Sequence, residues 1–131
     1  LHLSIRRQRQ MCIRDRYDYL DKIDLAYSVS DFIISRAGAS SVSELSIVGK
    51  PVIFIPSPNV AEDHQLKNAK SIVENEAALL VEEKNIDDLK KTISELNSSS
   101  DLRNKLSKNI KKSAFKNATK DIVDEIKILM N

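Results

Sequence analysis

Residues 52–55, Val-Ile-Phe-Ile, form a continuous apolar run enclosed by two prolines, and a second apolar run begins at Phe32. Runs this short and rich in β-branched residues are typical of parallel strands that are covered on both faces. A third run, Ala-Leu-Leu-Val, occupies residues 78–81. The sequence therefore predicts three parallel strands, near residues 32–35, 52–55 and 78–81.

The segments between and after these strands have the apolar periodicity of helices. Apolar residues recur at three- and four-residue spacing, which predicts helices near residues 21–30, 41–48, 63–75, 86–97, 101–112 and 119–130. Gly49 and Pro51 are stop signals for the second helix, and three serines ending at Ser100 offer an N-cap for the fifth. The order β-α-β-α-β followed by helices predicts an α/β fold with right-handed crossovers. Three strands are few for such a sheet, so we expect a fragment of a larger domain.

The first sixteen residues, LHLSIRRQRQMCIRDR, differ from the rest in composition: they hold five of the seven arginines and one acid. A basic arm is typical of nucleic-acid binding. This segment has no helical or strand pattern, however, and RRQRQMCIRDR resembles a translated sequencing adapter. We interpret residues 1–16 as non-native and expect them to pack poorly against the rest.

Without that segment the chain is slightly acidic. Subtracting its five arginines and one aspartate from 21 basic and 19 acidic residues leaves 16 and 18 in residues 17–131. The lysines between residues 105 and 120 lie on predicted amphipathic helices, where they indicate a solvated face. We expect no nucleic-acid partner.

Metal and thiol chemistry have little support. His64 is the only histidine outside residues 1–16, and Cys12 is the only cysteine. Since zinc sites need several such ligands, we expect no metal site and no cofactor. Asp63 precedes His64 at the start of a predicted helix, where it would act as N-cap. No apolar run approaches the ~18–20 residues that span a bilayer.

The segment Arg-Ala-Gly-Ala-Ser-Ser, residues 36–41, is a turn of small residues between the first strand and the next helix. Open parallel sheets bind ligands beyond the carboxyl ends of their strands, and helix N-termini bind anions. Gly38 would allow a positive φ or the close approach of a ligand. Alternatively, Ser41 and Glu44 fit a capping box, in which Glu44 bonds to the backbone N–H of Ser41. The residues alone leave both interpretations open.

The order of these pieces is characteristic of a known family. Three motifs follow one another along the chain: S-R-A-G-A-x-x-V-S-E-L, then G-x-P-hydrophobic-P, then D-H-Q-x-x-N-A. Residues 27–81 closely resemble the C-terminal domain of the MurG-type UDP-N-acetylglucosamine transferases of glycosyltransferase family 28. The resemblance implies a GT-B fold of two Rossmann-like domains. Residues 17–131 would then be the C-terminal part of the nucleotide-sugar-binding domain, a partial Rossmann-like parallel sheet followed by helices.

The resemblance also implies roles for individual residues. Glu44 would bind the ribose hydroxyls of the UDP moiety, and the backbone N–H groups that follow Gly38 would bind the diphosphate. Gln65 and His64 would bind the sugar hydroxyls, while Asn68 would support that loop. The implied donor-binding residues are Gly38, Ala39, Ser40, Ser41, Glu44, His64, Gln65 and Asn68.

The activity implied is inverting transfer of N-acetylglucosamine from UDP-N-acetylglucosamine to the undecaprenyl-pyrophosphoryl-MurNAc-pentapeptide lipid intermediate in peptidoglycan synthesis. The acceptor site and the catalytic base would lie in a missing N-terminal domain, so we assign no catalytic residue here and expect this chain alone to be inactive. The parent protein would be cytoplasmic and peripheral on the cytoplasmic face of the plasma membrane. Two alternatives are a nucleotide-sugar-binding module that acts with a separate catalytic chain, and a related family 28 glycolipid synthase.

Overall fold

The computed structural model describes residues 17–59 and 63–130. The elements in chain order are α2 (Ile23–Val29), β1 (Ile33–Ser35), α3 (Ala39–Val48), β2 (Val52–Phe54), α4 (His64–Glu74), β3 (Leu79–Leu80), the 3₁₀ turn η2 (Glu83–Asn85), α5 (Asp88–Ser98), α6 (Ser100–Ile110), the 3₁₀ turn η3 (Lys111–Ser113) and α7 (Ala118–Leu129). The predicted α/β order is confirmed. The predicted non-native segment, residues 1–16, lies outside the described residues.

The three strands form one parallel sheet in the order β1-β2-β3. Ile33 pairs with Val52, and Ile53 pairs with Leu79, so β2 is the central strand. The prediction of parallel strands is confirmed, although each strand is shorter than its apolar run. Because the strands are parallel, the segments that follow β1, β2 and β3 all emerge at the same edge of the sheet.

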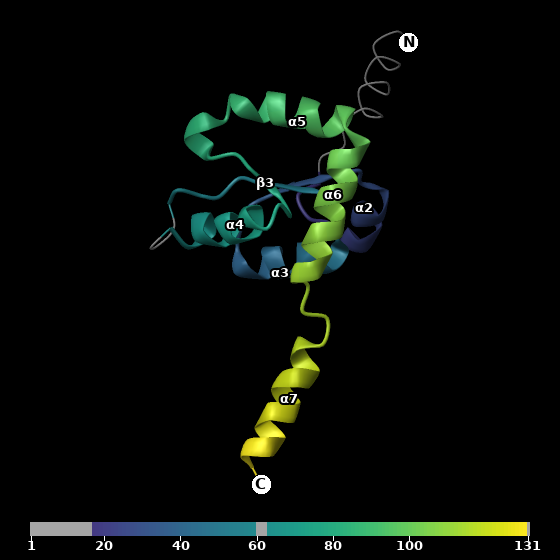
Figure 1. Cartoon of the computed structure of the whole chain (residues 1–131), viewed down its shortest axis with the longest axis vertical. Helices are drawn as coiled ribbons and strands as arrows, with labels where there is room; N and C mark the ends of the chain where they lie inside the picture. Colours follow the sequence, from purple (N-terminus) through teal and green to yellow (C-terminus); the bar gives the residue numbers. More distant parts are fainter. Residues whose placement is uncertain (1–16, 60–62, 131) are drawn as a thin grey trace.

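The sheet separates two apolar clusters, and successive residues of β2 point alternately into one and the other, as the two-residue period of a strand requires. Val52 and Phe54 belong to the first cluster and Ile53 to the second. Helices α3 and α4 lie on one side of the strands and α5 on the other (Figure 1). The first cluster also contains Ala37, Leu45, Ala69, Ile72, Ala77, Ala78 and Ile110, and the second contains Val81, Leu96 and Leu106.

Helix ends follow the signals in the sequence at two places. Gly49 ends α3 with a φ of 70°, and its N–H donates to the Leu45 carbonyl at 2.9 Å. Only glycine adopts this left-handed conformation without strain. At the start of α6 the Ser99 hydroxyl accepts a hydrogen bond from the Leu102 N–H at 3.2 Å. Both predicted signals are therefore confirmed.

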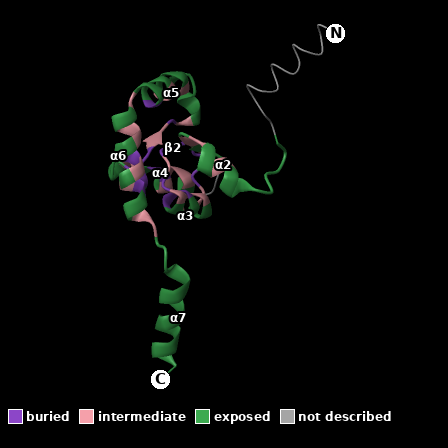
Figure 2. Ribbon diagram, turned by 90° about the vertical axis from the view of Figure 1, so that its right-hand side faces the viewer, coloured by how far each residue is buried: buried purple, intermediate pink, exposed green. Residues whose placement is uncertain are grey.

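Helix α7 extends away from the α/β body, and all of its residues are exposed (Figure 2). Its apolar stripe, which includes Ile122 and Ile126, is 50–60% exposed at these two positions. The 3.6-residue period thus predicted the helix, but no described residue covers the stripe. Among the described residues, no helix is long and apolar enough to cross a membrane.

Candidate functional site

Helix α3 starts within the small-residue segment 36–41, so the turn before it is only residues 36–38. Gly38 occupies the N-cap position with φ −62° and ψ 149°, and the helix begins at Ala39. The Val42 N–H donates to the Gly38 carbonyl at 2.9 Å, which is the first bond of the helix. The N–H groups of Ala39, Ser40 and Ser41 therefore precede the hydrogen-bonded ladder and point out of the helix start.

This start contradicts the capping-box interpretation. The predicted helix began at Ser41, but Ser41 is already the third residue of α3, and no side chain caps the helix. A capping box needs its serine in extended conformation at the N-cap. Because the chain turns helical two residues earlier, Glu44 lies one turn inside the helix and does not bond to Ser41.

Gly38 does not need to be glycine for conformational reasons. Its φ of −62° is open to any residue, so the predicted use of a positive φ is wrong. A Cβ built at Gly38 would meet only the Ser41 Oγ, at 3.7 Å, which is an ordinary contact. Neither backbone strain nor packing explains this glycine, and close approach of a ligand remains a proposal.

Glu44 is bound by a tyrosine from the preceding helix. The Tyr27 hydroxyl donates to Glu44 Oε1 at 3.1 Å. The Tyr27 ring is partly buried against the first apolar cluster, while Glu44 is exposed. Burial raises the pKa of the Tyr27 phenol above its ordinary value of 10.0, and the hydrogen bond to Glu44 and the negative charge of that carboxylate raise it further.

We expect Tyr27 to lose its proton above pH 10, its ordinary value. At pH values between the ordinary and the raised pKa, the unfolded chain has released this proton and the folded chain still keeps it. The contribution of Tyr27 to the free energy of unfolding is therefore complete at neutral pH, and it is lost as the pH rises through the raised pKa. The difference in tyrosinate absorbance between the chain and Tyr27→Phe measures this. In Glu44→Gln the pH of the Tyr27 transition should fall part of the way toward the ordinary value, because the carboxylate charge is gone but the burial of the ring remains. A Tyr27 transition at or below pH 10 would contradict the geometry.

The loop after β2 and helix α4 approach the same turn. Gln65 Oε1 accepts a hydrogen bond from the Ser57 N–H at 2.9 Å, and Asn68 Nδ2 donates to the Ala37 carbonyl at 3.1 Å. Asn68 therefore joins α4 to the turn before α3. His64 is exposed and is the first residue of α4.

Asp63 holds the N-cap position of α4 with a φ of 52°, but its side chain makes no capping hydrogen bond, so the predicted capping role is wrong. Aspartate tolerates this left-handed conformation better than most residues.

One interaction at this edge has no signal in the sequence. The Arg36 guanidinium donates to both Glu83 carboxylate oxygens, at 3.3 and 3.4 Å, and to the Ile55 carbonyl at 3.1 Å. It thereby joins the segments that follow all three strands. Both side chains are about half exposed, so the ion pair contributes little to stability. No local spacing signals a partner 47 residues away.

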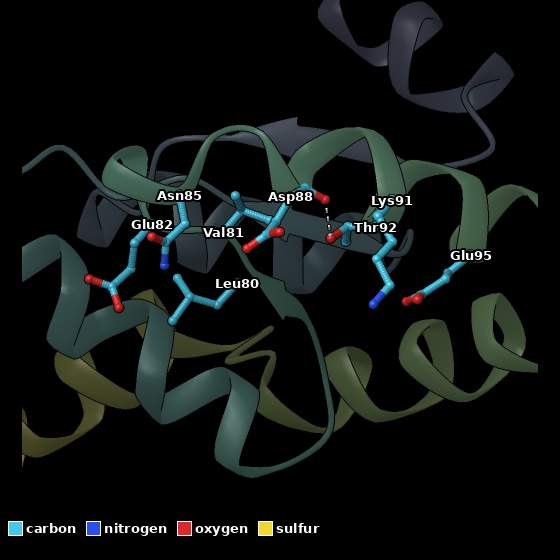
Figure 3. A pocket seen from close by; sticks show the side chains of 8 residues that line it. All are labelled: Leu80, Val81, Glu82, Asn85, Asp88, Lys91, Thr92 and Glu95. Atoms are coloured by element: carbon cyan, nitrogen blue, oxygen red, sulfur yellow. Dashed lines mark hydrogen bonds between the residues drawn. The ribbon is translucent and has the colours of Figure 1, made fainter.

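Hollows also lie at this edge of the sheet. One of about 410 Å³ is lined by Ile34, Ser35, Arg36, Ile55, Glu83 and Ile86. Another, of about 330 Å³, lies between the end of β3 and α5, and Figure 3 shows its polar side chains. Its lining is Leu80, Val81, Glu82, Asn85, Asp88, Lys91, Thr92 and Glu95. Among the described residues no cluster of three or more His, Cys, Asp or Glu could hold a metal ion.

Comparison with known proteins gives a consistent result. The family described as "Glycosyltransferase family 28 C-terminal domain" matches residues 4–125. This range reaches into residues 1–16, whose structure is not described, and the non-native origin of that segment stays a prediction.

Two curated relatives carry the same name, UDP-N-acetylglucosamine–N-acetylmuramyl-(pentapeptide) pyrophosphoryl-undecaprenol N-acetylglucosamine transferase. The protein from Flavobacterium psychrophilum is 58% identical over 109 residues, which are 82% of this chain and 30% of the relative. The one from Christiangramia forsetii is 50% identical over 115 residues, which are 87% of this chain and 31% of the relative. This chain therefore spans less than a third of the length of either relative.

A solved structure has the same fold. The crystal structure of Acinetobacter baumannii MurG matches with a TM-score of 0.77 and 30% identity, over 85% of this chain and 32% of that one. The expected partial GT-B fold is therefore confirmed.

Proposed function

This chain belongs to glycosyltransferase family 28, and on that premise we propose that it is the donor-binding part of a UDP-N-acetylglucosamine transferase of peptidoglycan synthesis. The proposed acceptor is the lipid-linked muropeptide named in the relatives, and it would bind to another part of the enzyme. The proposed location is the cytoplasmic face of the plasma membrane.

The observation that carries this proposal is the arrangement along one face of α3. The helix starts at Ala39, at the carboxyl edge of a parallel sheet, and its first N–H groups have no partner within the helix. Glu44 follows Ser40 by four residues, so it lies on the same face about 6 Å along the axis. In a nucleoside diphosphate the ribose is bonded to the diphosphate, so one ligand can contact both. The helix start would bind the phosphates, and the carboxylate would accept bonds from two ribose hydroxyls.

The start of α4 supplies the other side of the proposed site. Asn68 binds the Ala37 carbonyl, which holds α4 against the turn before α3. His64 and Gln65 open the same helix and would contact the hydroxyls of the transferred sugar. Gln65 already uses its carbonyl oxygen on the Ser57 N–H, so its amide NH₂ is the group left to donate to the sugar.

The chemistry that follows is charge stabilisation. In an inverting transfer the acceptor hydroxyl attacks the anomeric carbon from the side opposite UDP, and the bond to the β-phosphate oxygen breaks. Negative charge then grows on the departing diphosphate. Backbone N–H groups fixed at the start of α3 favour that charge without reorganisation. The base that takes the acceptor proton would come from the rest of the enzyme.

Glu44→Gln tests the proposal. We expect the KM for UDP-N-acetylglucosamine to rise roughly tenfold, because hydrogen bonds to a charged acceptor are worth about 1.5–3 kcal/mol. The melting temperature should move little, since Glu44 is exposed and caps no helix, and the amide oxygen of glutamine can still accept the Tyr27 hydrogen bond. The measurement is donor KM in a chimera in which residues 17–131 replace the corresponding part of the Flavobacterium psychrophilum relative.

The matched control is Glu74→Gln, which removes the same charge from an exposed residue at the far end of α4. It should leave the donor KM unchanged. Equal KM values for the two variants would contradict donor binding by Glu44. Competition with UDP-glucose and UDP-galactose in the same chimera tests the alternative of a related glycolipid synthase.

A further inference from the structure

We propose that Tyr27 is a positioning residue of the donor site, which holds the Glu44 carboxylate in the orientation that binds ribose. The inference rests on the proposed function and extends it to a residue outside both loops of the site. The structural basis is the hydrogen bond from the Tyr27 hydroxyl to Glu44 Oε1, at 3.1 Å, between α2 and α3.

The tyrosine is fixed independently of the carboxylate. Its ring packs against the first apolar cluster. Its backbone carbonyl accepts the Ser30 N–H at 3.4 Å and the Ser30 hydroxyl at 2.9 Å, which ends α2. Glu44, by contrast, is exposed on its helix, and a free glutamate populates many rotamers. The bond to a fixed tyrosine therefore restricts the rotamers of the otherwise flexible Glu44 side chain.

The bond also leaves the carboxylate able to bind a ligand. A phenol has one proton, and it donates that proton to Oε1. A carboxylate has about four acceptor positions, so three remain, including both on Oε2. Two ribose hydroxyls need only two of them. Binding a side chain that is already ordered costs less conformational entropy, so Tyr27 should raise donor affinity without taking part in the transfer step.

A purely structural role for Tyr27 makes a different prediction. If the bond only joined α2 to α3, its loss would lower the melting temperature and leave the donor KM unchanged. A positioning role changes KM, leaves kcat unchanged and depends on Glu44.

The test is Tyr27→Phe in the same chimera, alone and combined with Glu44→Ala. Phenylalanine keeps the ring that packs against the core and removes only the hydroxyl. We expect the KM for UDP-N-acetylglucosamine to rise about three- to tenfold, the range that corresponds to the entropy of ordering one flexible side chain, with kcat unchanged. In the Glu44→Ala background the same change should have no further effect, because Tyr27 acts through the carboxylate.

A donor that lacks the ribose 2′-hydroxyl gives a second readout. With it, Tyr27→Phe should change KM less than with the normal donor, because one of the positioned bonds is already absent. Two results would overturn the inference and leave the proposed function intact: an unchanged KM in Tyr27→Phe while Glu44→Ala raises KM, or an equal rise in KM with and without Glu44. If Glu44→Ala itself leaves KM unchanged, the proposed function fails, and the inference fails with it.

Discussion

Phe54→Ala is expected to lower the free energy of unfolding by about 3–5 kcal/mol, the usual cost of deleting a fully buried aromatic side chain. Phe54 is 0% exposed and belongs to the first apolar cluster. It lies in the central strand, where it pairs with Ser35 on one side and Leu80 on the other. A cavity there would border both neighbouring strands. Because domains of this size are stable by only about 5–15 kcal/mol, the variant should lose a large share of its stability.

The measurement is the urea midpoint of the chain and of the variant. Ile34→Ala is the matched control, since Ile34 lies in the adjacent strand and is 42% exposed. This variant should lose roughly 1 kcal/mol of the free energy of unfolding, because partial exposure of the side chain reduces both the transfer and the cavity contributions. Similar losses for the two variants would mean that the centre of the core lies elsewhere.

The strands could be predicted because a strand that is buried on both faces requires a continuous run of apolar residues. The run from Val52 to Ile55 has no polar position, and its strand is buried throughout. Gly49 was equally predictable, since a left-handed residue followed by Pro51 ends a helix for local reasons. Strand β2 and the end of α3 are both determined by residues within a few positions of them in the sequence.

The start of α3 was predicted wrongly because a local pattern competed with a tertiary contact. Ser41 and Glu44 have the spacing of a capping box, which requires an extended Ser41. The end of β1 at Ser35 and the Asn68 bond to the Ala37 carbonyl hold the turn close to the sheet. The helix then begins at Ala39, and the local pattern is not used.

Pairs of distant residues could not be predicted at all. Glu44 was proposed as a ribose ligand from a resemblance, but nothing near it in the sequence indicates that Tyr27 binds it. The two residues are 17 positions apart, on helices whose relative placement follows from packing around the core. The exposed stripe of α7 shows the same limit, because periodicity predicts a helix without indicating what covers it.

Ser40→Asp should have opposite effects on stability and on donor binding. Ser40 is exposed, and it is the second residue of α3. An acidic side chain in the first turn of a helix is favoured by the macrodipole, so we expect the free energy of unfolding to rise by about 0.3–1 kcal/mol. If the donor diphosphate occupies the same helix start, the new carboxylate opposes it. At about 6 Å and an effective dielectric constant of about 20, one pair of unit charges costs roughly 3 kcal/mol.

That cost corresponds to a rise of roughly 100-fold in the KM for UDP-N-acetylglucosamine, measured in the chimera alongside its melting temperature. Ser40→Asn is the control, since asparagine has nearly the shape of aspartate and no charge, and its KM should stay within about threefold of the unsubstituted value. Added salt should reduce the difference between the two variants, because screening weakens repulsion at an exposed site. Equal KM values for the aspartate and asparagine variants would place the diphosphate away from this helix. A more stable protein that binds its donor far less well has no explanation in folding, so this result would assign the small-residue turn to ligand binding.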